Sequence, residues 1–173
     1  GKIYFLFGRE YIKSKNSKGI TWKDAGMWSD FGGGKEKNET YEETAVRECF
    51  EETGGYLGSK NHLQKLINTQ LIKSISRNGY KTFIVQIPYD TKLIQNFREK
   101  FLSIEKKHPE LICKNGLYEK DMMKWFSCED IKKDYNKFRP WFKFYLNEIL
   151  KQPEEIIKQP EEIIKQSGEN DEK

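Results

Sequence analysis

The stretch GGGKEKNETYEETAVRECFEETGG, residues 32–55, decides how the rest of the sequence is interpreted. Three glycines precede residues 39–53, which contain neither proline nor glycine, and two more glycines follow them. Asn38 or Thr40 can cap a helix at its start, and glycine commonly follows a helix end, so the pattern predicts a helix over residues 39–53. This helix is rich in glutamate although the chain has a formal net charge of +4.

Three glutamates share one face of the predicted helix. Glu48, Glu51 and Glu52 are three and four residues apart, so their carboxylates fall within an arc of about 100°. Like charges at this spacing repel each other, and a divalent cation with oxygen ligands would offset the repulsion. Arg47 lies four residues before Glu51 and can orient these carboxylates. Taken alone, however, three helical glutamates are more often a solvent-exposed face, so a metal site needs a further signal.

The further signal is the spacing of the charged residues and glycines, which fits G-x5-E-x7-R-E-U-x-E-E-x-G-U, where U is aliphatic. The fixed positions are Gly33, Glu39, Arg47, Glu48, Glu51, Glu52 and Gly54. This segment resembles the Nudix box of the Nudix hydrolases. The two aliphatic positions differ, because Cys49 occupies the first and Gly55 replaces the second. The resemblance extends over about residues 2–150.

The resemblance implies an α+β fold, the Nudix αβα sandwich with a mixed β-sheet, and the rest of the pattern agrees with it. Asn78-Gly79 lies between two segments rich in β-branched and aromatic residues and predicts a hairpin. Apolar runs predict strands at residues 2–8, 27–31, 66–76, 79–90 and 122–127. Helical spacing predicts further helices at residues 91–107, 128–134 and 139–150.

The resemblance also implies an activity and a cofactor. Nudix hydrolases cleave a nucleoside diphosphate linked to another moiety, and they use Mg²⁺ or Mn²⁺. By this resemblance Glu48, Glu51 and Glu52 bind the metal, with the carbonyl of Gly32 as a further ligand. Glu51, held by Arg47, is our candidate for activating the attacking water.

Several residues are candidates for binding the substrate. Backbone N–H groups of a glycine turn before a helix favour an anion, and tryptophan can stack on a base. The resemblance also implies that acidic residues before the last strand recognise the base, although an ordinary charged loop is at least as frequent there. The candidates are Gly33, Gly34, Arg9, Trp28, Glu119 and Asp121, with Trp22 as a second stacking residue.

Three functions remain open from the sequence. The first is hydrolysis of a nucleotide, which means a nucleoside triphosphate, an oxidised nucleotide or a nucleotide sugar. The second is mRNA decapping with release of 7-methyl-GDP, favoured by lysines in residues 13–23, 100–107 and 132–139. A composition rich in Lys, Ile and Asn, typical of AT-rich genomes such as those of large DNA viruses, also favours it. The third is a catalytically silent Nudix-fold binding module, which the intact box disfavours.

The bulk properties fit an intracellular protein with one domain. We expect a hydrolase domain at residues 1–150 and a low-complexity charged tail at residues 151–173, where KQPEEII occurs twice. No apolar run approaches the ~20 residues that cross a bilayer, so no membrane partner is expected. The three cysteines, Cys49, Cys113 and Cys128, form no CxxC pair and predict a reducing, cytoplasmic location. The oligomeric state stays open.

Overall fold

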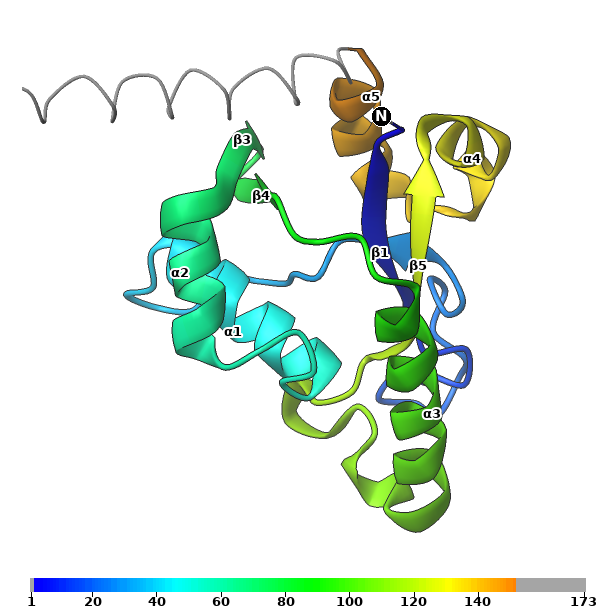
Figure 1. Cartoon of the computed structure of the whole chain (residues 1–173). Helices are drawn as coiled ribbons and strands as arrows, with labels where there is room; N and C mark the ends of the chain where they lie inside the picture. The colour runs from blue at the N-terminus through cyan, green and yellow to red at the C-terminus, as the bar shows by residue number, and fades with distance from the viewer. Residues whose placement is uncertain (1, 152–173) are drawn as a thin grey trace, which may run out of the picture.

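The computed structural model describes residues 2–151 and is drawn in Figure 1. Gly1 and residues 152–173 lie outside the described residues, so the expected tail falls almost entirely beyond them. Within the described part, the strands are β1 (Tyr4–Glu10), β2 (Trp28–Ser29), β3 (Leu71–Arg77), β4 (Tyr80–Val85) and β5 (Lys120–Ser127). The α-helices are α1 (Tyr41–Thr53), α2 (Lys60–Gln70), α3 (Thr91–Lys107), α4 (Cys128–Lys133) and α5 (Lys143–Lys151).

The first sheet has the strand order β2-β1-β5 and is antiparallel. Its register pairs Phe5 with Phe126, and a bulge lies between Arg9 and Glu10, where β1 leaves the ladder. Phe7 is buried and packs edge-on against Phe138, with ring centroids 5.2 Å apart. The sheet therefore carries an aromatic core on one face, and Glu10 at the end of β1 lines the cleft described below.

The second sheet is the hairpin β3–β4, which confirms the Asn78-Gly79 turn. Asn78 and Gly79 have φ values of 50° and 77°, as a two-residue hairpin of this type requires. The predicted strand at residues 66–76 is wrong in its first half, because residues 66–70 end helix α2. Ser59 caps this helix, and Leu63, Leu66 and Ile67 are spaced to form one apolar side of it.

Helix α1 was predicted at the right place and begins two residues later than expected. Thr40 is the N-cap and forms a capping box with Glu43, so Glu39 precedes the helix. Asn38 has a φ of 69° and turns the chain just before this cap. Gly54 ends the helix in the left-handed conformation, with a φ of 59°. Both ends of the helix are therefore fixed by local chemistry.

The helices flank the sheets as an α+β arrangement, which confirms the expected fold class. Figure 1 shows α1, α2 and the β3–β4 hairpin on one side and β1, β5 and α3 on the other. Both ladders are antiparallel, and a single parallel bridge in the described residues joins Trp28 to Phe138. No helix within residues 2–151 is long and apolar enough to cross a membrane.

Candidate active site

A polar cleft of about 550 Å³ lies along the carboxylate face of α1. Six acidic residues line it, Glu10, Glu36, Glu48, Glu51, Glu52 and Glu119, together with three basic residues, Lys15, Arg47 and Arg139. The formal net charge of these side chains is therefore −3. A cleft with this excess of negative charge is a natural site for cations.

Arg47 connects the carboxylates at the mouth of the cleft. Its Nη1 donates to Glu48 at 2.8 Å and to Glu51 at 3.2 Å, and its Nη2 donates to the carbonyl oxygen of Gly34 at 2.9 Å. Its Nε donates to Glu39 at 2.6 Å, and only 15% of the side chain is exposed. Every nitrogen of this guanidinium therefore has a protein acceptor, and the group fixes the glycine turn relative to α1.

Glu39 supports this arrangement from the loop before the helix. It accepts from Arg47, from the backbone N–H of Glu36 at 3.0 Å and from the Thr44 hydroxyl at 2.9 Å. These hydrogen bonds, that from Arg47 first, lower the pKa of the Glu39 carboxyl to about 2. Glu39 does not line the cleft, so its part in the site is to hold Arg47.

A fully buried lysine lies next to Glu52. The ammonium of Lys120 donates to the carboxylate of Glu10 and to Ser29 Oγ at 2.9 Å, and it lies 3.6 Å from Glu52 Oε1. The side chain of Glu52 is 2% exposed, and its Oε2 has no hydrogen-bond partner among the described residues. A buried oxygen without a hydrogen-bond partner is costly, and a ligand bound to this oxygen would offset that cost.

Burial raises the pKa of three carboxyl groups of the cleft. The pKa of Glu52 lies well above its ordinary value because the group is buried, and Lys120 opposes the shift. The pKa of Glu48 is raised by burial against the hydrogen bond from Arg47, and that of Glu119 by burial and then by Glu10. These shifts come first from burial, and buried carboxyl groups with a raised pKa are typical of functional sites.

The glycine turn fits tightly against the helix. A Cβ at Gly33 would lie 2.6 Å from the carboxylate of Glu48, so any side chain there would displace that carboxylate. A Cβ at Gly32 would collide with the hydroxyl of Tyr80, whereas one at Gly34 would meet nothing within 4 Å. All three glycines line the cleft, close to Glu48.

The structure separates the expected substrate-binding residues into two groups. Glu119 lines the cleft, as does Trp22, whose exposed fraction is 37%. Arg9 and Asp121 lie outside the cleft and bind each other, with Nε–Oδ1 and Nη2–Oδ2 distances of 2.8 and 3.2 Å. Trp28 is also outside it and packs edge-on against Phe126 in the core, 93% of its surface being buried.

Sequence reasoning did not predict a group of buried charged residues beside the box glutamates. Glu10 lies near the start of the chain, Lys120 and Arg139 lie more than 100 residues later, and they meet only after folding. Arg139 Nη1 donates to Glu10 at 3.2 Å, and its Nε donates to Asp24 at 3.0 Å. A lysine or arginine in a polar stretch gives no sequence signal of such burial.

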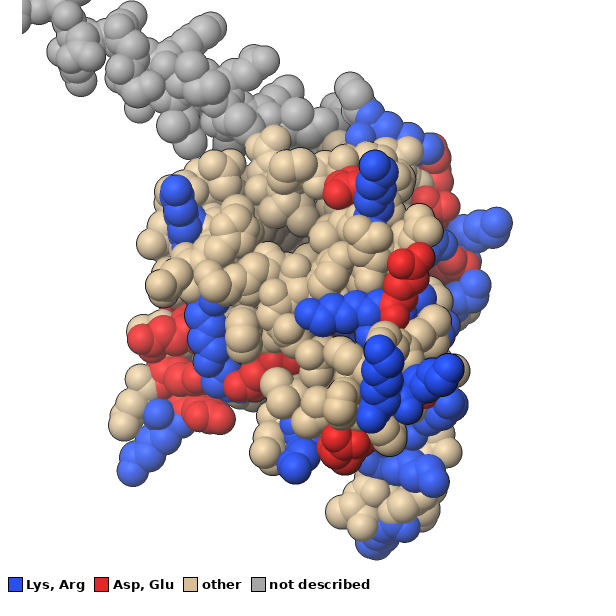
Figure 2. Space-filling view, turned by 60° about the horizontal axis from the view of Figure 1, so that its bottom comes forward, with Lys and Arg blue, Asp and Glu red and all other residues tan. Residues whose placement is uncertain are grey.

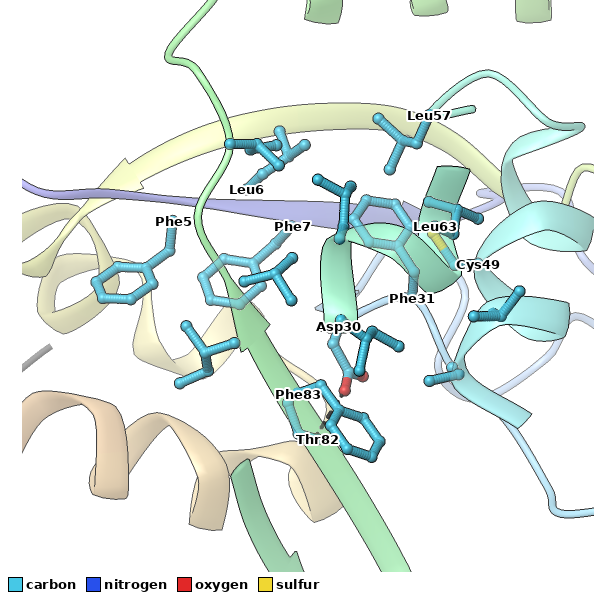
Figure 3. Close-up of a pocket in the computed structure, with 18 of the residues that line it drawn as sticks. Phe5, Leu6, Phe7, Asp30, Phe31, Cys49, Leu57, Leu63, Thr82 and Phe83 are labelled. Atoms are coloured by element: carbon cyan, nitrogen blue, oxygen red, sulfur yellow. Dashed lines mark hydrogen bonds between the residues drawn. The ribbon is translucent and has the colours of Figure 1, made fainter. Parts of the chain in front are cut away.

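A larger, mostly apolar cavity of about 860 Å³ adjoins the polar cleft at the glycine turn and is shown in Figure 3. Phe5, Phe7, Leu63 and Phe83 line it, and Cys49 reaches it from α1. Its size alone does not make it the reaction site, because Glu48, Glu51 and Glu52 line the polar cleft and not this cavity. We therefore assign the chemistry to the polar cleft.

Comparison with known families decides the assignment of the chain. A model of the NUDIX domain matches residues 9–145, which include the whole glutamate helix and nearly all of the cleft. The chain belongs to the Nudix family. Comparisons with curated proteins and with solved structures found no match. Membership in the Nudix family indicates a hydrolase of pyrophosphate-containing substrates, and enzymes of this family generally use divalent cations.

The donor set of this Nudix domain fits a divalent cation. Carboxylates are the oxygen ligands that Mg²⁺ and Mn²⁺ prefer, and Glu52 Oε2 is buried without a partner among the described residues. Within residues 2–151 no three acidic, histidine or cysteine side chains already converge as a metal cage. Arg47 is paired with both Glu48 and Glu51, at 2.8 and 3.2 Å. A bound cation would share these carboxylates with Arg47.

Proposed function

We propose that this chain is a divalent-metal-dependent Nudix pyrophosphohydrolase that cleaves the pyrophosphate bond of a nucleotide. The substrate is a nucleoside diphosphate linked to another moiety, such as a nucleoside triphosphate, an oxidised nucleotide or a nucleotide sugar. The observation that carries the proposal is Glu52 Oε2, which no group of residues 2–151 hydrogen-bonds, in a cleft that also contains Glu48, Glu51 and Arg47. This combination suits cation binding beside a phosphate group.

Each carboxylate of α1 has its own part in this proposal. Glu48, Glu51 and Glu52 hold Mg²⁺ or Mn²⁺, with the carbonyl of Gly32 as a further ligand. A cation bound there supplies charge neutralisation of the phosphates and a more acidic water. Glu51 accepts the proton of the attacking water, because its side chain is 23% exposed and can reach water in the cleft. Arg47 keeps Glu51 oriented through the 3.2 Å hydrogen bond.

Recognition of the base falls to residues of the cleft that lie outside α1. Trp22 offers an exposed aromatic face, and the carboxylate of Glu119 can accept from base N–H groups. Gly33 and Gly34 offer backbone at the cleft wall for the phosphates. Arg9, Trp28 and Asp121 support the fold in our proposal, since they are engaged elsewhere.

Capped RNA is a second candidate substrate, favoured by the lysine-rich loop at the cleft. Lys15 and Trp22 come from this loop, residues 11–26, and both line the cleft. Figure 2 shows many basic side chains on one face of the molecule, most of them on the side that carries β5 and α3. A long polyanion would gain from such charge, and its binding would weaken steeply with salt.

The cysteines favour an intracellular, reducing setting for this activity. Cys49, Cys113 and Cys128 are all unpaired in the described residues. Burial raises the pKa of the Cys49 and Cys113 thiols to about 12 and about 11. They are therefore protonated and unreactive at neutral pH.

The test is a hydrolysis panel with the full chain in Mg²⁺ or Mn²⁺. The panel contains ordinary and 8-oxo nucleoside triphosphates, ADP-ribose, a nucleotide sugar, dinucleoside polyphosphates and a capped RNA, with the Glu51→Gln variant as blank. We expect turnover of a free nucleotide. Release of 7-methyl-GDP from capped RNA alone would assign decapping instead, and silence across the panel with metal bound would favour a binding module.

A further inference from the structure

Arg139 is a positively charged group of the cleft that the Nudix box does not include. It follows the short helix Tyr135–Lys137, far from α1 in the sequence, and lines the same cleft as the box glutamates. Its backbone N–H donates to the carbonyl of Trp28 at 2.9 Å, which ties this segment to strand β2. The chain thus brings an arginine to the cleft from a distant element.

The guanidinium of Arg139 is held in one orientation by two buried carboxylates. Its Nε donates to Asp24 at 3.0 Å, and its Nη1 donates to Glu10 at 3.2 Å. The side chains of Asp24 and Glu10 are 7% and 8% exposed, and that of Arg139 is 17% exposed. Such a planar group, fixed at two nitrogens, loses little conformational freedom when a ligand binds it.

One nitrogen of Arg139 is left for a ligand. No protein acceptor within residues 2–151 is hydrogen-bonded to Nη2, whereas every guanidinium nitrogen of Arg47 is taken by a carboxylate or a carbonyl. Lys15 also lines the cleft but is exposed, so water screens its charge. Arg139 is therefore the best-prepared donor to an anion in the cleft.

We propose that Arg139 binds a phosphate group of the substrate, with Asp24 and Glu10 as its positioning residues. The inference rests on the proposed function, because it names the protein group that holds a phosphate in the cleft lined by Glu48, Glu51 and Glu52. Charge-assisted hydrogen bonds from arginine to phosphate are among the stronger polar contacts in proteins. The contact exists in the bound substrate before reaction, so its loss should raise KM more than it lowers kcat.

The test compares Arg139→Lys with the wild-type chain in binding and in kinetics. Lysine keeps one positive charge beside the two carboxylates but lacks the planar fork. We expect a loss of at least ~10-fold in affinity for α,β-methylene-ADP, measured by calorimetry both in EDTA and in Mg²⁺. KM should rise by a similar factor, and kcat should change by less than ~3-fold.

Arg98→Lys is the matched control, because Arg98 is half-buried, donates to the backbone carbonyl of Asp121 at 2.8 Å and lines neither cavity. We expect it to bind the analogue like the wild type. If Arg139→Lys does not fold, the double variant Asp24→Asn/Arg139→Met removes one charge of each sign and should show the same loss.

Three results would overturn the inference: no binding of the analogue to the wild type, unchanged affinity and KM in the Arg139 variants, or an equal loss in Arg98→Lys. Failure of the proposed function gives a different result. In that case the wild type hydrolyses nothing in the panel, yet the analogue still binds and the Arg139 variants still lose it.

Discussion

We expect the variant Glu52→Gln to be more stable than the wild type without metal and less stable than the wild type with metal. Glu52 is 98% buried, and the burial that raises the pKa of its carboxyl makes the ionised form costly at neutral pH. Because the pKa of Glu52 is higher in the folded than in the unfolded state, the free energy of unfolding falls as pH rises from the unfolded-state pKa towards the folded-state pKa. Glutamine has the same shape without the charge, and Lys120 keeps its hydrogen bonds to Glu10 and Ser29.

The metal-free variant should therefore be more stable than the wild type. Removing this buried charge should raise the free energy of unfolding by about 1 kcal/mol or more. For a chain of this length that raises Tm by at least about 2 °C, measured by scanning calorimetry in EDTA at pH 7.5.

Addition of Mg²⁺ should reverse the order of the two proteins. At a concentration 100-fold above Kd, binding stabilises the wild type by about 2.7 kcal/mol, and the variant should gain little of this. Turnover should fall at least ~100-fold, as when a group that stabilises transition-state charge is lost. Glu42→Gln is the control, because Glu42 lies on α1 outside the cleft with 39% of its side chain exposed. A variant that Mg²⁺ stabilises as much as the wild type, with near-normal turnover, would refute this reasoning.

Two other perturbations test the support of the carboxylates. Arg47 lowers the pKa of the Glu39 carboxyl from 4.5 to about 2, so this pair stabilises the fold above about pH 4.5 and loses its contribution as pH falls towards 2. Glu39→Gln should flatten the pH dependence of the urea midpoint in this window, and an unchanged slope would contradict it. Gly33→Ala places a methyl group 2.6 Å from the Glu48 carboxylate, so we expect Mn²⁺ affinity in calorimetry to fall at least ~10-fold. Gly34→Ala meets no atom within 4 Å and should bind Mn²⁺ normally; equal losses in both would exclude the steric explanation.

Local signals were enough to predict much of the fold. The α1 helix is set by Thr40 and Gly54 at its ends, and the β3–β4 hairpin by Asn78-Gly79, and both features are visible in the sequence. The assignment failed where two local preferences compete. Residues 66–70 contain an isoleucine and a threonine, which favour a strand, but their apolar residues continue a stripe that begins at Leu63, so they extend α2.

Of the residues that line the cleft, the sequence pattern grouped only those of α1. Spacing along one helix fixes which glutamates share a face, and Glu48, Glu51 and Glu52 line one cleft. Glu119 and Asp121 looked equivalent in the sequence, yet only Glu119 reaches the cleft. Tyr118 has a φ of 52° and turns the chain just before β5, and no sequence signal reports that turn.

The buried charges on the far side of the cleft depend on long-range contacts. Glu10 meets Lys120 and Arg139 across more than 100 residues of sequence, and each is an ordinary charged residue in its own segment. Only the fold shows that these groups are buried and paired. The arginine that we assign to the phosphate therefore could not be found without the structure.

The most direct test of the central claim is the rate of pyrophosphate-bond hydrolysis as a function of Mg²⁺ concentration. Wild-type chain and Glu52→Gln are measured side by side on the best nucleotide of the panel, starting from EDTA. We predict that the wild type is inactive in EDTA, gains activity in a saturable way with Mg²⁺, and exceeds the variant at least ~100-fold at saturation. Hydrolysis that persists in EDTA, or a variant as active as the wild type, would contradict a metal-dependent reaction at these carboxylates.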